Sequence, residues 1–335
     1  MAPAPEFSLP LDTAPMEART TEVLPAAGGP WQYEPKWDGF RCLAFKKGEN
    51  IRLFAKSGKD LGRYFPEMVA YLKTARAVEF VIDGELVVII DGKPEFDALQ
   101  MRLHPAESRI RKLSLSTPAK FTVFDILADE NGAVLLELPL RQRRSLLERF
   151  VQSVQDEDKL VISPATTDRA KAQTWLDASG HGATDGVVAK LLDAPYRPGE
   201  RTMLKVKRIR TADCVVGGFR YRSGTNVVGS LLLGLYNKNG MLDHVGFTSM
   251  ISASEAPALT PKLEALKGEG FTGRAPGGPS RWATGKSSEW QPLRPELVVE
   301  VKFDHVTNDR FRHGTRFVRW RPDKAPRQCT FEQIG

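Results

Sequence analysis

Cysteine and long apolar stretches are scarce in this 335-residue chain. Its three cysteines, Cys42, Cys214 and Cys329, stand far apart and have no CxxC spacing. This usage excludes a disulfide scaffold and a cysteine zinc site, and it is typical of a reducing cytoplasm, where we expect the protein to be. The longest nearly apolar run, residues 227–236, has about half the length of a membrane span, so we expect no transmembrane helix and no membrane partner. The first residues lack a basic region followed by an apolar one, so we also expect no secretory signal.

The composition excludes several other classes of protein. Hydrophobic residues make up 41% of the chain and charged residues 27%, which is the balance of an ordinary globular protein and not of a collagen-like or disordered one. At roughly 100–200 residues per domain, the length predicts two domains, each large enough to bury a core.

Positive charge is concentrated toward the end of the chain. The formal net charge is +7, and residues 211–335 hold 17 of the 48 basic residues against 12 of the 41 acidic ones. Residues 310–327 contain seven basic side chains and a single acid. Such a cluster suits a polyanion such as nucleic acid or a nucleotide phosphate, but charge alone does not distinguish it from a solvated strand face.

The first 210 residues combine strand and helix patterns. Residues 1–30 are rich in proline and alanine, and we interpret them as a loose arm that wraps the first domain. Runs rich in β-branched and aromatic residues predict strands, and periodic segments between them predict helices, which together indicate an α+β or mixed α/β domain. The strands are expected at residues 40–47, 50–56, 80–90, 120–128 and 185–192, and the helices at residues 65–74, 140–150 and 170–178.

The remaining residues predict a smaller β domain. Short strands are expected at residues 213–221, 229–237, 244–250 and 296–304, with a short helix at residues 261–267 and a long loop at residues 268–289. Short strands around one helix favour a small β-barrel, and the OB-fold is the natural candidate.

The sharpest local feature is the segment EPKWDGFR over residues 34–41. It places Lys36 beside a tight Asp-Gly turn, with Glu34 two residues before it and Arg41 five residues after it. A lysine nucleophile reacts as the neutral amine, so nearby cations or burial must lower its pKa. Taken alone, the segment is more typical of a surface lysine in a hairpin turn, because short motif matches often occur by chance.

Later segments supply groups that suit a nucleotide. Glu85 interrupts an apolar strand, and a carboxylate there either binds a hard cation or a ribose, or faces solvent. Phe124 is an aromatic that stacks on a base or belongs to the core. Lys205 and Lys207 fall on the same face of a predicted strand, because side chains alternate with a period of two. An anion between them would relieve their repulsion, although a solvated strand face is the alternative.

Seven segments occur in an order that resembles a known family. They are KWDGFR, AKSGKDL, VIDGELVV, FTVFDIL, TDGVVAK, MLKVK and RFVRWRPDK. This order resembles motifs I, Ia, III, IIIa, IV, V and VI of the covalent nucleotidyltransferases, and among them it is most similar to the compact C type of bacterial ATP-dependent DNA ligases. The resemblance implies an α+β adenylation domain over residues 1–208, including the arm at 1–30, and a β-barrel OB-fold domain over residues 209–335.

The resemblance implies a role for each matching residue. Lys36 would be the nucleophile that takes AMP from ATP, and Glu34 would contact the adenine amino group. Phe124 would stack on the adenine. Arg41 would help to hold the AMP ribose and the nick phosphate, while Glu85 would hold the ribose or a metal.

The remaining cations are implied to meet phosphates. Lys205 and Lys207 would contact the α-phosphate. Arg321 and Lys324, with an aspartate between them, match the last motif, which orients the pyrophosphate leaving group. Arg319 is a weaker match beside them.

Two positions depart from the family pattern. Motif IV normally has a glutamate where this chain has Asp185, which moves a metal-binding carboxylate back by one methylene. Motif Ia usually reads Arg-Asn-Gly, and here Lys56 stands at its start, so the bidentate contact of an arginine is lost and the role of Lys56 stays open. Magnesium, or manganese in its place, suits Glu85 and Asp185 as ligands together with phosphate oxygens.

The sequence therefore predicts a monomeric ATP-dependent DNA ligase that seals nicked double-stranded DNA in repair through a lysyl-AMP intermediate. An RNA ligase or an mRNA-capping guanylyltransferase is the first alternative, because these enzymes share the nucleotide-binding core. A non-catalytic nucleic-acid-binding module is the second, and the presence of Lys36, Glu85, Lys205 and Lys207 counts against it.

Overall fold

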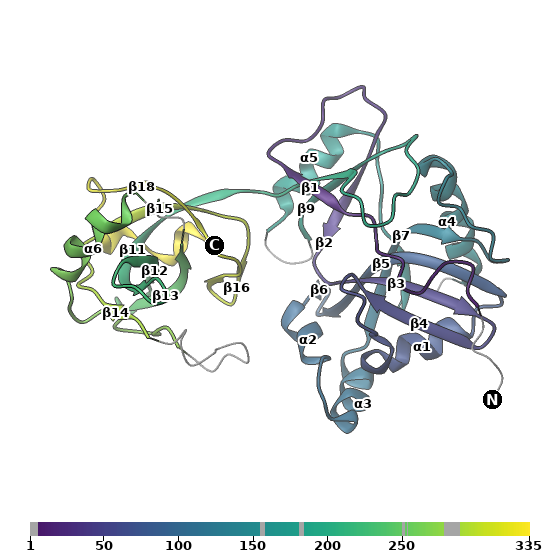
Figure 1. Ribbon diagram of the computed structural model, residues 1–335, viewed down its shortest axis with the longest axis horizontal. Helices are drawn as coiled ribbons and strands as arrows, with labels where there is room; N and C mark the ends of the chain where they lie inside the picture. Colours follow the sequence, from purple (N-terminus) through teal and green to yellow (C-terminus); the bar gives the residue numbers. More distant parts are fainter. Residues whose placement is uncertain (1–5, 155–157, 181–183, 250–251, 253, 278–288) are drawn as a thin grey trace. The chain divides into compact units, whose positions relative to one another are not determined.

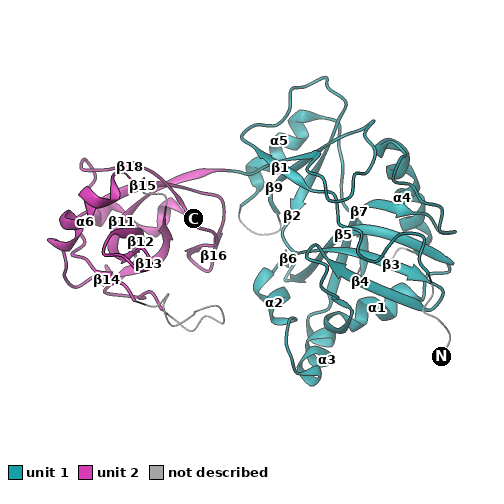
Figure 2. Cartoon of the chain, in the orientation of Figure 1, with its two compact units in different colours: residues 1–208 teal, residues 209–335 magenta. Residues whose placement is uncertain are grey.

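The computed structural model describes residues 6–335 except 155–157, 181–183, 250–251, 253 and 278–288. The chain divides into two compact units, residues 1–208 and residues 209–335 (Figure 2). Among the described helices, none has the length and apolar character needed to span a membrane.

Unit 1 contains two sheets, which we call the small sheet and the large sheet (Figure 1). The small sheet has the order β1 (Ala18–Thr21), β10 (Met203–Val206), β9 (Thr184–Leu191) and β2 (Trp31–Trp37). The large sheet has the order β4 (Asn50–Ala55), β3 (Phe40–Lys47), β5 (Glu79–Ile90), β7 (Ala119–Ala128) and β8 (Leu160–Ile162), and β6 (Lys93–Pro94) pairs with β5. The helices are α1 (Pro66–Lys73), α2 (Phe96–Met101), α3 (Glu107–Ser116), α4 (Leu140–Val154) and α5 (Arg169–Ala178). The strands and helices predicted for this region are present, with ends that differ by a few residues.

The large sheet buries both of its faces. On one face, Phe80 and Phe121 of the sheet share an apolar cluster with Met68 of α1 and Phe150 of α4. On the other face, the N-terminal arm contributes Leu9 and Met16 to a second apolar cluster. The arm continues into β1, which pairs in parallel with β10. The expectation of a loose arm is therefore wrong for the described residues up to Thr21, because Leu9 and Met16 are buried in the domain and residues 18–21 form a strand of the small sheet.

Alternation of side chains gives the small sheet one apolar face and one polar face. Tyr33, Val187 and Val206 point to the side covered by Ala172 and Leu176 of α5. On each of these strands, the residues that alternate with the apolar ones point to the opposite side, toward the large sheet. These residues are Glu34, Lys36, Val188, Lys190 and Lys205.

The Asp-Gly turn after Lys36 passes the chain from one sheet to the other. β2 pairs with β9, whereas the next strand, β3, pairs with β4 and β5. The hairpin considered for this segment is therefore absent, because β2 and β3 belong to different sheets. Gly39 is needed at the crossing, since a Cβ there would lie 2.2 Å from the carbonyl oxygen of Leu86. The crossing leaves Lys36 on one sheet and Arg41 on the facing one.

A buried ion pair fixes the strand that carries Phe124. The Arg143 guanidinium on α4 donates to both carboxylate oxygens of Asp125 on β7, at 2.8 and 3.0 Å. Both side chains are almost fully buried. Removal of either partner would leave an uncompensated buried charge, so the pair keeps α4 and β7 in register.

Unit 2 is built on a sheet with the order β13 (Leu242–Thr248), β12 (Val228–Tyr236), β11 (Arg210–Tyr221), β15 (Val298–Phe303) and β18 (Arg316–Trp320). β14 (Gln291–Pro292) pairs with β11, and β16 (Val306–Thr307) pairs with β17 (Arg310–Phe311). Among the described residues, a single bridge, Thr248 to Thr315, joins the two ends of the sheet, so the strand pairing does not confirm the predicted β-barrel.

The single long helix of unit 2 differs from its prediction. The structure has α6 at Ala256–Glu264, whereas the sequence predicted residues 261–267. Prolines favour the first turn of a helix, and Pro257 occupies that place, while Pro261 lies inside the helix. The predicted loop at 268–289 has neither helix nor strand in its described residues, and residues 278–288, like the predicted strand end at Met250, lie outside the description.

Candidate active site

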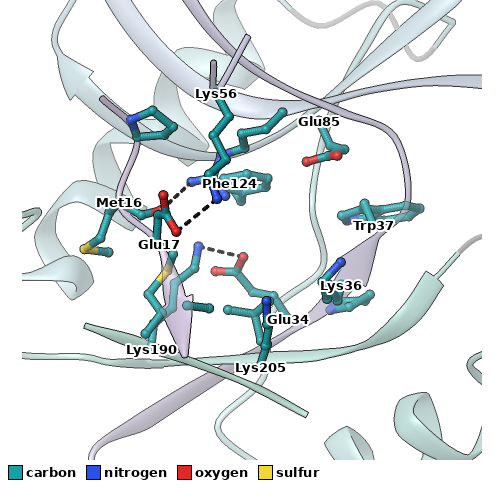
Figure 3. A pocket seen from close by; sticks show the side chains of 16 residues that line it. Met16, Glu17, Glu34, Lys36, Trp37, Lys56, Glu85, Phe124, Lys190 and Lys205 are labelled. Carbon is teal, nitrogen blue, oxygen red and sulfur yellow. Dashed lines mark hydrogen bonds and ion pairs between the residues drawn. The ribbon is translucent and has the colours of Figure 1, made fainter. Parts of the chain in front are cut away.

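A cavity of about 240 Å³ lies in unit 1 between the facing sides of the two sheets (Figure 3). The small sheet supplies its floor from β2, β9 and β10, the large sheet supplies residues of β3, β5 and β7, and the arm closes one side with residues 15–18. Most of the residues predicted from the sequence line it: Glu34, Lys36, Arg41, Lys56, Glu85, Phe124 and Lys205.

One carboxylate next to the cavity contacts two lysines, of which Lys36 lines the cavity, whereas Asp185 and Lys207 are not among the lining residues. Asp185 lies 2.7 Å from the Lys36 ammonium and 3.1 Å from that of Lys207. The Asp185 residue is 4% exposed, so little water screens these contacts. Lys207 is the first residue after β10, not part of the strand, yet it reaches the same carboxylate as Lys36.

Lys205 stands beside this ion triad without a carboxylate of its own among the described residues. Burial lowers the pKa of Lys205, and the neighbouring Lys36 and Lys207 lower it further. The floor therefore carries more positive than negative charge. An anion that enters the cavity would relieve this repulsion, and a phosphate group has the charge and the acceptor oxygens to do so.

A second buried ion pair orients Glu34. Its two carboxylate oxygens accept from Lys190 at 2.8 Å and from the Gln32 amide at 2.7 Å (Figure 3). All three side chains are buried, and Lys190 lies opposite Gln32 in the β2–β9 ladder. These two donors fix the orientation of the Glu34 carboxylate. Its remaining lone pairs can accept a hydrogen bond from a ligand, but an ionised carboxylate has no proton to donate.

The ring of Phe124 lies between these groups and the large sheet. The Arg41 guanidinium is 4.5 Å from the ring centroid, and the Lys190 ammonium is 4.6 Å from it. Phe124 is 7% exposed and lines the cavity. An aromatic face held by cations at the edge of a cavity is suited to stack on a planar base.

Arg41 is held by a network that the sequence did not indicate. Asp83 is fully buried and accepts from Nε and Nη2 of Arg41, both at 2.6 Å. The Tyr196 hydroxyl donates to the same carboxylate at 2.6 Å and accepts from the backbone N–H of Met16. Burial and the neighbouring Asp83 raise the pKa of Tyr196 well above its usual value, so the hydroxyl stays a donor. The network ties the arm, the large sheet and Arg41 together.

Glu85 faces the cavity with few partners. Burial raises the pKa of Glu85 to about 7, against the opposing effects of Arg41 and Lys36. Its only hydrogen bond among the described residues comes from the Gly39 backbone N–H at 3.2 Å. A carboxylate with free lone pairs in such a place is suited to bind a hydroxyl group or a hard cation.

Lys56 reaches the cavity from the end of β4 and pairs with the arm. Its ammonium lies 2.9 Å from Glu17 (Figure 3). Glu17 also contacts Arg201 at 3.3 Å. Hydrogen bonding to Lys56 lowers the pKa of Glu17. The lysine that replaces the expected arginine is therefore engaged by a residue of the N-terminal arm.

The predicted basic residues near the end of the chain belong to unit 2. Arg321 donates to Asp213 at 2.7 Å and to Asp323 at 2.8 Å, and Lys324 lies 3.7 Å from Asp213. Arg319 pairs with Glu300 on β15 at 2.6 Å. Within unit 2, each of these cations therefore has an acidic partner.

The described residues include no group of three or more His, Cys, Asp or Glu side chains placed to hold a metal ion. The pair predicted from the sequence is Glu85, which lines the cavity, and Asp185, which already contacts two ammonium groups. This donor set fits Mg²⁺, which commonly uses one or two carboxylates together with waters and substrate phosphates.

Several site residues were missed by sequence reasoning. Lys190 and Gln32 could have been found from the alternation that places them on the face of Glu34 and Lys36. Tyr196 gave no comparable signal, because its contacts with Met16 and Asp83 join residues 180 and 113 positions apart.

Together these groups describe a site for an attack on a phosphorus atom. A primary amine, excess cations, an aromatic wall and an oriented acceptor carboxylate converge on one cavity. This arrangement can bind a purine nucleotide with its phosphates over the lysines and form a covalent bond between lysine and phosphate.

Comparison with known proteins agrees with this chemistry. Residues 14–207 match the family described as "ATP dependent DNA ligase domain", and residues 224–324 match "ATP dependent DNA ligase C terminal region". The chain is 43% identical over 329 residues to DNA ligase C1 of Mycolicibacterium smegmatis and 40% identical over 340 residues to DNA ligase C of Mycobacterium tuberculosis, covering 96% of this chain and 93% of each relative. It is also similar to a solved mycobacterial DNA ligase D complexed with ATP and MES, with 29% identity, a TM-score of 0.52, and coverage of 97% of this chain and 99% of that one.

The raised pKa of Glu85 predicts a pH-dependent stability difference. Because the folded state keeps the Glu85 proton up to about pH 7 and the unfolded state releases it near its ordinary value, the stabilisation from Glu85 is complete at low pH and is lost as the pH rises through 7. Glu85→Gln should therefore gain stability relative to the wild type, by up to about 3 kcal/mol, as the pH rises from about 4.5 to 7. Chemical denaturation of unit 1 at several pH values measures this difference. The exposed Glu107→Gln is the control, and a Glu85→Gln difference that does not change with pH would contradict the assignment.

Proposed function

The chain belongs to the ATP-dependent DNA ligase family, and we propose that it seals nicks in duplex DNA, in repair, through AMP bound covalently to Lys36. The observation that carries the proposal is the convergence of Lys36, Lys205 and Lys207 around the single carboxylate of Asp185, beside a cavity with an aromatic wall. Relatives named DNA ligase at 40–43% identity favour this function over the RNA ligase and capping alternatives.

In the first step, the Lys36 amine attacks the α-phosphorus of ATP. A phosphorus–nitrogen bond forms, the bond to the pyrophosphate oxygen breaks, and pyrophosphate leaves. Lys36 must lose a proton to attack, and the Asp185 carboxylate at 2.7 Å is its nearest acceptor among the described residues. Lys205 and Lys207 balance the negative charge of the α-phosphate as it changes bonding partners.

The base is selected at the other end of the cavity. Glu34, fixed by Lys190 and Gln32, accepts a hydrogen bond from the adenine amino group. A guanine would present a carbonyl oxygen at the same place, and two acceptors repel, so ATP is favoured over GTP. Phe124 stacks on the base, and Arg41, held by Asp83, is aimed at the ribose.

A divalent metal fits the remaining carboxylates. Glu85 and Asp185 would hold Mg²⁺ or Mn²⁺ with the phosphate oxygens, and the metal would neutralise charge on the leaving pyrophosphate. Glu85 has lone pairs free for this purpose, since its one hydrogen bond is to the Gly39 N–H.

The later steps use DNA. AMP passes from Lys36 to the 5′-phosphate at a nick, and the 3′-hydroxyl then displaces AMP to form the phosphodiester bond. We assign duplex binding to unit 2, which we interpret as an OB-fold that carries the basic run of residues 310–327. Such binding rests on phosphate contacts and does not depend on sequence.

Lys36 should be the single residue that becomes adenylated. Incubation with ATP and Mg²⁺ should add one adenylyl group to the intact mass, and peptide mapping should place it on Lys36. Lys36→Ala should abolish the mass shift, because Lys36 pairs with Asp185 and lines the cavity, whereas Lys207, which also contacts Asp185, is not among the lining residues. Lys112→Ala, an exposed control on α3, should keep it, and GTP should give none. Adenylylation on another lysine would refute the assignment.

Arg321 and Lys324 should serve the first step more than the last. The double substitution Arg321→Ala with Lys324→Ala should abolish self-adenylylation by ATP, because both cations are proposed to orient the leaving pyrophosphate. Sealing of a nick that already carries AMP should be much less affected. The matched control, Arg222→Ala with Lys238→Ala, removes two exposed cations of the same unit and should change neither reaction strongly. Normal self-adenylylation with poor sealing would instead identify Arg321 and Lys324 as DNA contacts.

A further inference from the structure

Unit 2 contains a cationic cluster that lies outside the family motifs. Arg220 on β11, His244 on β13 and Arg310 on β17 form it, and Arg274 flanks them. The Arg310 guanidinium contacts the His244 ring at 3.1 Å, and the charge of Arg220 is near enough to help lower the pKa of His244. We call Arg220, His244 and Arg310 the arginine–histidine cluster.

A rigid aromatic layer supports the cluster. His244 meets the ring of Phe271 edge-on at 5.3 Å, and Phe271 contacts Trp290 at 5.6 Å. Phe271 rests against Gly217 and Gly234, where a Cβ would come within 2.7 and 2.9 Å of its ring. The position of His244 is therefore fixed by packing and not by an exposed loop.

His244 presents a buried hydrogen-bond donor with no acceptor. The Arg310 Nη2 lies 3.1 Å from His244 Nδ1, and a guanidinium only donates, so Nδ1 holds a lone pair. The ring proton is then on Nε2. His244 is 4% exposed, and its Nε2 has no hydrogen-bond partner. Burial, followed by the charges of Arg310 and Arg220, lowers the pKa of His244 to about 3, so the ring is neutral at working pH.

The two arginines of the cluster lack the acidic partners that other arginines of the unit have. Arg220 makes no ion pair within the described parts of the chain, and its Nε is buried without a hydrogen-bond partner. Burial lowers the pKa of Arg310, and the nearby Arg274 adds repulsion. By contrast, Arg294 and Arg319 each contact a glutamate at 2.7 and 2.6 Å.

Burying cations and an N–H donor without partners costs folding free energy, and a bound anion would offset this cost. The ligand must carry a negative charge for the arginines and an acceptor oxygen for the neutral Nε2–H, which is the chemistry of a phosphate group. Of the phosphates available to a ligase, a phosphodiester of duplex DNA suits a unit with net positive charge and a basic run that begins at Arg310.

We propose that Arg220, His244 and Arg310 form a binding site for one backbone phosphate of the DNA duplex. The proposal rests on the proposed ligase function and adds a specific contact of unit 2 that none of the nucleotide-binding motifs contains. It assigns two kinds of contact: the arginines contribute charge, and His244 contributes a neutral hydrogen bond.

The test is equilibrium binding of nicked duplex as a function of salt concentration. Arg220→Gln and Arg310→Gln should each weaken binding and reduce the slope of log K against log salt by about 1, because one phosphate contact releases about one counterion. His244→Phe keeps the ring that packs on Phe271 and removes the donor. It should weaken binding by about tenfold and leave the slope unchanged, because a neutral group releases no counterion.

Three controls separate the outcomes. Arg294→Gln removes an arginine that already pairs with Glu296 and should leave the slope unchanged. Self-adenylylation should be normal in every variant of the cluster, and melting temperatures report any loss of fold. If folded Arg220→Gln and Arg310→Gln bind nicked duplex as the wild type does, the proposed phosphate site is wrong. If these variants bind DNA normally but lose self-adenylylation, the cluster binds the phosphates of ATP and the proposal is also wrong. If the wild-type protein neither adenylates itself nor seals nicks, the proposed function fails instead.

Discussion

The structure of unit 1 depends on one carboxylate placed between lysines. Without Asp185, the neighbouring ammonium groups of Lys36, Lys205 and Lys207 would repel one another with no counter-charge between them. Repulsion at these distances in a partly dry site is several times stronger than in water. The single acid holds Lys36, the proposed nucleophile, and Lys207 in place, yet leaves an excess of positive charge. In the function proposed above, the phosphates of ATP would balance this charge.

The alternation of side chains along the strands places the other residues of the site around these lysines and Asp185. One face of the small sheet packs on α5, so the alternate residues of β2, β9 and β10 must face the large sheet. The Asp-Gly crossing then places Arg41 on the opposite wall, where Asp83 and Tyr196 hold it. Unit 2 shows the same physical theme at the arginine–histidine cluster, where positive charge is again left for a phosphate.

Much of this site could be predicted, because the motif order and a period of two are both visible in sequence. Lys36, Glu34 and Lys205 were identified by those signals, and they line one cavity. The contacts that orient them were not predictable, since the pairing of Tyr196 with Asp83 joins residues 113 positions apart without a local pattern. The hairpin and the loose arm were wrong for the same reason: the pairing of β2 with β9 and of β1 with β10 is set by tertiary packing.

The most direct test of the central claim is the rate of self-adenylylation when Asp185 is changed. Asp185→Glu keeps the charge and lengthens the side chain by one methylene, and its rate should stay within about tenfold of the wild type. Asp185→Ala removes the counter-charge and should reduce the rate by at least about a hundredfold over a range of Mg²⁺ concentrations. An Asp185→Ala variant that adenylates Lys36 at the wild-type rate would contradict the account.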